Sequence, residues 1–126
     1  MMSAFLIFLG GGFGAVCRHL VGLGGMRLLG PGFPYGTLTV NIVGSLVMGL
    51  LIGWLVRHSG TSPDIRLFAA TGFLGGFTTF SAFSLDTANL WMRGEIAATL
   101  FYVLASVILS IAAVFIGLAI MRVSSL

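Results

Sequence analysis

The chain has 126 residues, of which 58% are apolar and only 7% are charged. A soluble domain carries about 25% charged residues, so this composition indicates an integral membrane protein. The net charge of +3 is scattered along the chain, which argues against nucleic-acid binding, because that function needs a basic patch. At about 20 residues per crossing, the length allows about four membrane helices in a single domain over residues 1–126 and leaves no room for an extramembrane domain.

The predicted membrane helices are separated by turns that contain glycine and proline. The turns read LLGPGFPYG, RHSGTSPD and MRGE. The N-terminus MMSAFLIFLGGGFG lacks the positive region of a signal peptide, so it is interpreted as the start of the first helix. The expected helices extend from about Ser3 to Met26, Tyr35 to Val56, Asp64 to Trp91 and Glu95 to Met121.

The third predicted helix contains an interruption. Residues 75–83 read GGFTTFSAF, and glycine pairs together with local hydroxyl groups weaken a helix. A broken membrane helix is tolerated where its freed backbone lines a cavity or binds an ion. Carbonyl groups at the end of the first half suit a small cation, and amide groups at the start of the second half suit an anion. Phe80 and Phe83 begin the second half on nearly the same face, and ring edges can stabilise a small anion.

The arginines near the helix ends are divided almost evenly between the two sides of the membrane. Loop arginines normally mark the cytoplasmic side, so a weak bias predicts that the chain inserts in both orientations. Two opposed copies would then form an antiparallel dimer, the geometry that larger transporters achieve with inverted repeats. The side of the C-terminus holds Arg57, Arg66 and Arg122, and the opposite side holds Arg27, Arg93 and the more deeply placed Arg18.

Small residues recur at four-residue spacing on two predicted helices. Gly10 and Gly14 lie on the first helix, and Ser45, Gly49 and Gly53 lie on the second. Small residues let membrane helices approach closely, so these positions predict helix–helix packing.

Polar side chains within the helices form a candidate hydrogen-bond track. Tyr102, Ser106 and Ser110 are spaced four apart, so their hydroxyl groups line one face of the last helix. Asn41 supplies an amide within the second helix. Two interpretations stay open. These groups either form a track along an ion pathway, or they only hydrogen-bond to neighbouring helices or to their own backbone.

Asp86 and Arg18 are the charged residues that lie furthest within apolar segments. An intramembrane acid usually faces a cavity or a partner, and Asp86 either does so or pairs with an arginine near the interface. Arg18 either extends to the membrane surface or lends positive potential to a vestibule.

Three motifs, taken in chain order, resemble the Fluc fluoride channel family, also called CrcB proteins. They are GAVCR at 14–18, GTLTVNIVGS at 36–45 and GFLGGFTTFSAFS at 72–84. The resemblance covers essentially the whole chain. It implies an antiparallel, dual-topology homodimer in the bacterial inner membrane that exports fluoride by passive, selective conduction. It also implies paired pores at the dimer interface and a central structural sodium ion.

The resemblance further implies roles for particular residues. The carbonyl oxygens of Gly75 and Thr78 would hold sodium, and Arg18 would contribute positive potential to the vestibule. The implied fluoride pathway comprises Asn41, Phe80, Phe83, Ser81, Tyr102, Ser106 and Ser110.

Two departures from the family pattern affect the expected polar track. Ala82 stands where many members have threonine, so that hydroxyl is either missing or replaced by that of a neighbour such as Ser81 or Ser84. Asp86 stands where many members have glutamate, and its shorter side chain leaves open whether it contacts the ion.

Other classes of function are also weighed. A small multidrug transporter relies on a glutamate in its first helix, and the first helix here has no acidic residue. A non-transporting membrane assembly subunit would use the polar residues only for packing. An enzyme is the least expected class, because the sequence shows no catalytic triad, metal cluster or cofactor loop.

Overall fold

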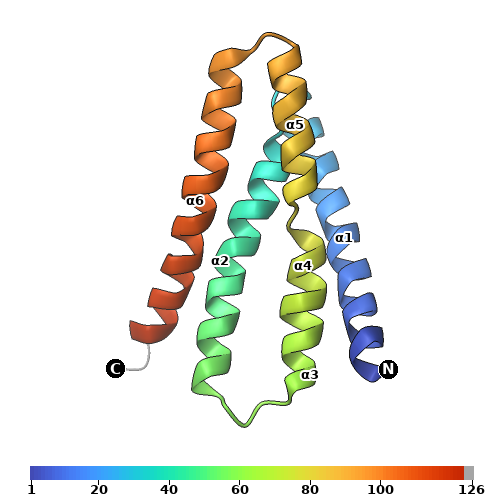
Figure 1. The fold of residues 1–126 in the computed structure, drawn as a ribbon, viewed down its shortest axis with the longest axis vertical. Coiled ribbons are helices and arrows are strands. Elements are labelled where there is room, and N and C mark those ends of the chain that lie inside the picture. Colours follow the sequence, from blue (N-terminus) through green and yellow to red (C-terminus); the bar gives the residue numbers. More distant parts are fainter. Residues whose placement is uncertain (124–126) are drawn as a thin grey trace.

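The protein is a helical bundle in which four segments are long and apolar enough to cross a membrane (Figure 1). A computed structural model describes residues 1–123. The prediction of four membrane helices is confirmed, and each observed boundary lies within one helical turn of the expected one. The crossing segments are α1 (Met2–Leu29), α2 (Tyr35–Arg57), the composite segment Pro63–Met92 and α6 (Ile96–Val123).

The third crossing is built from several pieces. It begins at α3 (Pro63–Arg66), whose N-terminus is capped by Ser62, and continues as a π-helix, η1 (Leu67–Leu74). The short helix α4 (Gly75–Phe77) follows, and α5 (Phe80–Met92) completes the crossing. Between α4 and α5 the two threonines 78 and 79 have extended backbone, which Figure 1 shows as a non-helical link near the middle of the bundle.

Glycines let two pairs of segments meet backbone to backbone. A methyl group at Gly10 or Gly14 of α1 would overlap the carbonyl oxygen of Phe68 or Phe73 in η1. A methyl group at Gly117 of α6 would lie 2.5 Å from the carbonyl oxygen of Leu46 in α2. The predicted packing role is confirmed for the glycines of α1, because only a residue without a side chain fits this contact.

The N-terminus, the last described residues of α6 and the α2–α3 turn lie at one end of the bundle, and the α1–α2 and α5–α6 turns lie at the other (Figure 1). The second end is fastened by Arg93, whose Nη2 donates to the Gly32 carbonyl oxygen at 2.8 Å and pairs with Glu95 at 2.8 Å. At the first end, Arg57 Nη1 donates to the carbonyl oxygen of Met121 at 3.1 Å. Most large apolar side chains outside these contacts are exposed, as expected for surfaces that meet lipid or another protein.

Candidate functional site

The extended link between α4 and α5 is held by the side chain of Asn41. Asn41 Nδ2 donates to the carbonyl oxygen of Thr79 at 3.0 Å, and the amide nitrogen of Thr79 donates to Asn41 Oδ1 at 2.8 Å. One side chain therefore satisfies both backbone groups of a residue that has left the helix. Each backbone group left unpaired in hydrocarbon costs roughly several kcal/mol of free energy, so these two hydrogen bonds stabilise the interruption. The second Nδ2 hydrogen of Asn41 remains for another acceptor.

Thr79 also begins the second half-helix. Its hydroxyl oxygen accepts a hydrogen bond from the amide nitrogen of Ala82 at 3.1 Å, which is the usual capping arrangement at a helix N-terminus. Ser81 Oγ lies 3.3 Å from the same hydroxyl group. Because Thr79 is fixed by Asn41 and in turn caps α5, the direction of α5 depends on the second helix of the chain.

The backbone carbonyls around the link fall into two sets. The Leu74 oxygen accepts from both the amide nitrogen and the hydroxyl group of Thr78, at 3.0 and 2.9 Å. The Gly76 oxygen accepts from Arg18 Nε at 3.1 Å. Within residues 1–123, none of the hydrogen bonds that join separate elements ends on the carbonyl oxygen of Gly75 or of Thr78. The contacts that join separate elements of the described chain therefore do not use these two oxygens.

Arg18 is half-buried and bonded to the backbone of the third crossing segment. The side chain reaches from α1 to the end of α4, where its guanidinium group meets the partial negative charge of a helix C-terminus. Of the two alternatives left open by the sequence, extension to the membrane surface does not describe this contact. The positive charge instead lies next to the interruption.

A cavity of about 370 Å³ lies beside the interruption, between α2, α5 and α6. Its wall combines apolar rings with hydroxyl and amide groups. Ser106 and Ser110 of α6 contribute buried hydroxyl oxygens that have no hydrogen-bond partner in the described part of the chain. A buried polar atom without a partner is costly, so these two atoms indicate a position for a ligand or water. The lining residues are Asn41, Ser45, Thr78, Thr79, Phe80, Phe83, Ser106, Val107, Ser110 and Ile111.

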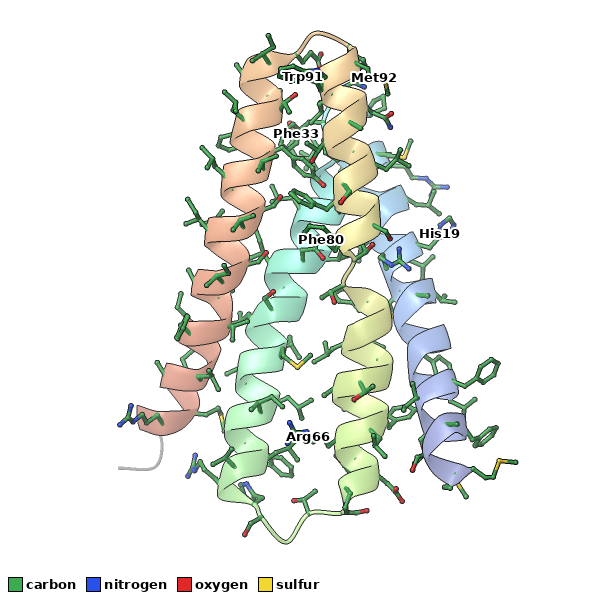
Figure 2. The ribbon with its side chains drawn as sticks, viewed as in Figure 1. His19, Phe33, Arg66, Phe80, Trp91 and Met92 are labelled. Carbon is green, nitrogen blue, oxygen red and sulfur yellow. The ribbon has the colours of Figure 1, made fainter. Side chains whose placement is uncertain are left out.

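Phe80 and Phe83 lie on this wall in different surroundings. Their ring centroids are 5.4 Å apart and the ring planes are inclined by 52°. Phe83 is buried, with 8% of its surface exposed, whereas Phe80 is 77% exposed. Figure 2 shows Phe80 near the middle of the bundle, at the level of the link. The ring of Phe83 is therefore packed within this chain, whereas the ring of Phe80 is not covered by it.

Tyr102 lies behind the cavity rather than on its wall. Its side chain is fully buried, and its ring centroid is 5.2 Å from that of Phe83. The hydroxyl group donates to Asp86 Oδ2 at 3.1 Å. Asp86 thus pairs with a tyrosine, and the described residues place no arginine within ion-pair distance of it.

The hydroxyl groups near Ala82 point elsewhere. Ser84 Oγ donates to the carbonyl oxygen of Phe80 at 2.9 Å, and Ser81 approaches Thr79. Neither serine lines the cavity. The structure therefore assembles most of the expected pathway residues around one cavity but leaves Ser81 outside it and Tyr102 one layer behind.

Several residues of the site were missed by sequence reasoning. Ser45 was assigned to packing and lines the cavity, one helical turn before Gly49, which contacts α6. Thr79 was not singled out, although threonine just before a helix is a recognisable capping signal. Val107 and Ile111 carry no such signal, because apolar residues on a membrane helix look alike whichever way they face.

Comparison with known proteins identifies relatives over nearly the full length. The family described as CrcB-like protein, Camphor Resistance (CrcB), matches residues 5–118. A protein of Agrobacterium fabrum named fluoride-specific ion channel FluC is 54% identical over 122 residues, which cover 97% of this chain and 98% of that one. Proteins of the same name from Mesorhizobium japonicum and Rhodopseudomonas palustris are 54% and 52% identical, each with 98% of its length covered.

These matches agree with the motifs found in the sequence. The residues matched to the family include the interruption, the cavity and all four crossing segments except residues 2–4 of α1 and 119–123 of α6. Together with four membrane-spanning helices, they make the chain a multi-pass protein of the bacterial inner membrane. The chain belongs to the CrcB-like protein family.

Proposed function

We propose that this protein is a fluoride-selective ion channel, rather than an enzyme, and that it exports cytoplasmic fluoride by passive conduction. The observation that carries the proposal is the pair of buried, unpartnered hydroxyl groups of Ser106 and Ser110, two residues that line the cavity between α2, α5 and α6. Hydroxyl groups that lack partners can donate to a passing anion. The names of the 54%-identical relatives support fluoride as that anion.

In the proposed pathway, fluoride exchanges water for protein contacts one after another. Asn41 supplies its second amide hydrogen, Ser106 and Ser110 supply hydroxyl hydrogens, and the edges of Phe80 and Phe83 supply the positive part of the ring quadrupole. Each contact must be weak enough for the ion to leave as well as to bind. Chloride is larger and would not fit the same closely packed path.

Tyr102 and Ser81 take lesser parts in this pathway. Tyr102 supports the ring of Phe83 from behind, while its hydroxyl group is bonded to Asp86. Ser81 lies on the exposed side of α5 and can reach the ion only where a second chain completes the pore.

We also propose that the channel is an antiparallel homodimer with paired pores at its interface. The strongest support is Phe80, a cavity-lining ring that is 77% exposed in the single chain and therefore needs another surface to complete the wall. The nearly even division of arginines between the two ends of the bundle supports insertion in both orientations.

We further propose a structural sodium ion at the link between α4 and α5. Sodium prefers oxygen ligands, and in the described chain no hydrogen bond between separate elements ends on the carbonyl oxygens of Gly75 and Thr78. Gly75 is exposed, so its oxygen and the corresponding oxygen of a second copy could hold one ion between them. When bound, sodium would supply a fixed positive charge at the interruption, next to the positive charge of Arg18.

The test is ion efflux from liposomes that contain the purified protein. Fluoride release is followed with a fluoride electrode, and chloride release is measured in the same way. Rapid fluoride release without chloride release is expected. Release of neither ion from an intact dimer would contradict the channel and favour a non-transporting assembly subunit, whereas proton-coupled uptake of a cationic dye would favour a small multidrug-type transporter.

Orientation is tested separately by labelling. Ser59 lies in the α2–α3 turn, and Cys17 is the only cysteine of the chain. In the variant Cys17→Ser with Ser59→Cys, a membrane-impermeant maleimide is expected to label part of the protein from outside the cell and the rest only after the membrane is opened. Labelling from one side alone would rule out dual topology.

A further inference from the structure

A half-buried aromatic ring at the end of the bundle lies outside the pathway described above. Phe33 belongs to the α1–α2 turn and was not singled out in the sequence. Its ring centroid is 5.4 Å from that of Tyr102, with an angle of 87° between the planes. Phe33 also packs against the buried cluster of Phe83, Leu90 and Tyr102. A turn residue therefore inserts into the core between α5 and α6, as Figure 2 shows.

The rings form a continuous column from this turn to the interruption. Phe80 contacts Phe83 at 5.4 Å, Phe83 contacts Tyr102 at 5.2 Å, and Tyr102 contacts Phe33 at 5.4 Å, all between ring centroids. The edge-to-face contact at Phe33 is the most directional of the three, because the edge of one ring meets the face of the other. The position of Tyr102 thus depends on Phe33 on one side and on its hydrogen bond to Asp86 on another.

The turn itself is rigidly held. The carbonyl oxygen of Phe33 accepts from the amide nitrogen of Tyr35 at 2.8 Å, and the preceding carbonyl, that of Gly32, accepts from Arg93 at 2.8 Å. Pro34 follows with its backbone angle φ fixed near −79°. These bonds fix the backbone on both sides of Phe33, and contacts with the rings of Tyr35, Phe101 and Tyr102 surround its side chain.

Phe33 lies between a cavity wall and the buried cluster it packs against. A second cavity, of about 380 Å³, lies at this end of the bundle, and Phe33 and Leu90 are part of its wall. Tyr102 and Phe83 are not on that wall and belong to the buried cluster. Removing the ring would therefore open the cluster toward the second cavity and allow Tyr102 to turn away from Phe83.

We infer that Phe33 is a positioning residue for ion selectivity. Through Tyr102, its ring holds the ring of Phe83 in place on the cavity wall. The inference rests on the proposed fluoride conduction, because selectivity is the property that Phe33 would set. It concerns a residue that touches neither the ion nor the proposed sodium site.

The test compares Phe33→Leu and Phe33→Met with the ring-retaining Phe33→Tyr, each as purified dimer in liposomes. Phe33→Leu is expected to lower fluoride efflux about three- to tenfold, the range set by loss of one edge-to-face contact, and to lower the fluoride-to-chloride flux ratio. Phe33→Tyr should restore both values to near the wild-type level. Phe33→Met serves if the leucine variant does not form a dimer, and the same losses are expected.

Phe8→Leu is the matched control, because Phe8 is 74% exposed on α1 and its loss should leave flux and selectivity unchanged. Unaltered selectivity in the leucine and methionine variants, with the wild type conducting fluoride, would overturn the inference about Phe33 alone. A lower flux that Phe33→Tyr does not restore would also overturn it. Absence of fluoride conduction in the wild type would instead overturn the proposed function, and the inference with it.

Discussion

Helices α2 and α6 touch closely in one region and, together with α5, enclose a cavity in the next. Around Gly49 and Gly117 the backbones touch, and a methyl group on either glycine would overlap the opposite helix. Further along, the same faces carry Ser45, Ser106 and Ser110, and the helices enclose a space. Small apolar residues close the interface, whereas small polar residues keep it open and leave hydroxyl groups without partners. We call the contact at Gly49 and Gly117 the closed part of the α2–α6 interface and the cavity at Ser45, Ser106 and Ser110 its open part. The closed part sets the spacing of α2 and α6, and this spacing determines the width of the open part.

The largest effect is expected at the open part, from Asn41→Ala. This change removes both hydrogen bonds to Thr79 and leaves its amide and carbonyl groups unpaired in the membrane. We expect fluoride efflux to fall by more than tenfold, because leaving even one buried polar group without its partner costs about 1–3 kcal/mol. Efflux from liposomes measures this loss.

Asn89→Ala is the control for this prediction, since Asn89 is an exposed asparagine of α5. Its efflux should match that of the wild type. Asn41→Ala efflux at the wild-type rate would show that the link between α4 and α5 does not depend on this side chain, and it would remove the structural reason for placing the ion path beside it.

The closed part is tested by Gly117→Ala. The new methyl group would lie 2.5 Å from the carbonyl oxygen of Leu46, so α2 and α6 must move apart. Overpacking of this kind costs about 1–3 kcal/mol in the free energy of unfolding, which titration with a denaturing detergent can measure. Gly24→Ala is the matched control, because a methyl group at Gly24 meets nothing within 4 Å. Equal stability of the two variants would contradict the description of a closed contact.

Much of the fold could be predicted from the sequence, because the membrane fixes the length and apolarity of each crossing. The interruption was also visible, since Gly75, Gly76 and two threonines weaken any helix. The π-helix Leu67–Leu74 was not predicted, because LFAATGFL carries no residue that distinguishes a wider helix from an ordinary one. This segment lies in close contact with the glycines of α1, and such a contact exists only in the assembled bundle.

The sequence predicted which residues form the site better than it predicted which atoms those residues contact. Asn41 was expected to donate to an ion, and the structure adds that most of its amide is bonded to Thr79, 38 residues away. Phe33 was missed, because a phenylalanine in a turn gives no sign of which rings it will meet. Contacts between distant residues follow from how helices pack, and no local pattern in the chain encodes them. The roles toward fluoride and sodium stay predictions.

A smaller effect is expected from Ser106→Ala, in which efflux should fall although stability does not. The hydroxyl oxygen is buried without a partner, so its removal should leave the stability unchanged or slightly raise it. If the hydroxyl group donates to fluoride, efflux should nevertheless fall about three- to tenfold, which corresponds to the loss of one hydrogen bond. Ser84→Ala is the control, because Ser84 bonds to its own helix and does not line the cavity. Unchanged efflux would identify Ser106 as a packing residue.

The smallest effect is expected from variants of Thr79, which distinguish its backbone bonds to Asn41 from the cap made by its hydroxyl group. Its backbone is fixed by Asn41, whereas its hydroxyl group only caps α5 through the amide of Ala82. Thr79→Ala removes the cap alone and is expected to lower the free energy of unfolding by about 1 kcal/mol, while Thr79→Ser keeps the oxygen and should lower it less. Efflux should change less in either variant than in Asn41→Ala, because the backbone of the link stays paired. If Thr79→Ala instead abolished conduction as Asn41→Ala is expected to do, the hydroxyl group rather than the backbone clamp would be what shapes the open part of the α2–α6 interface.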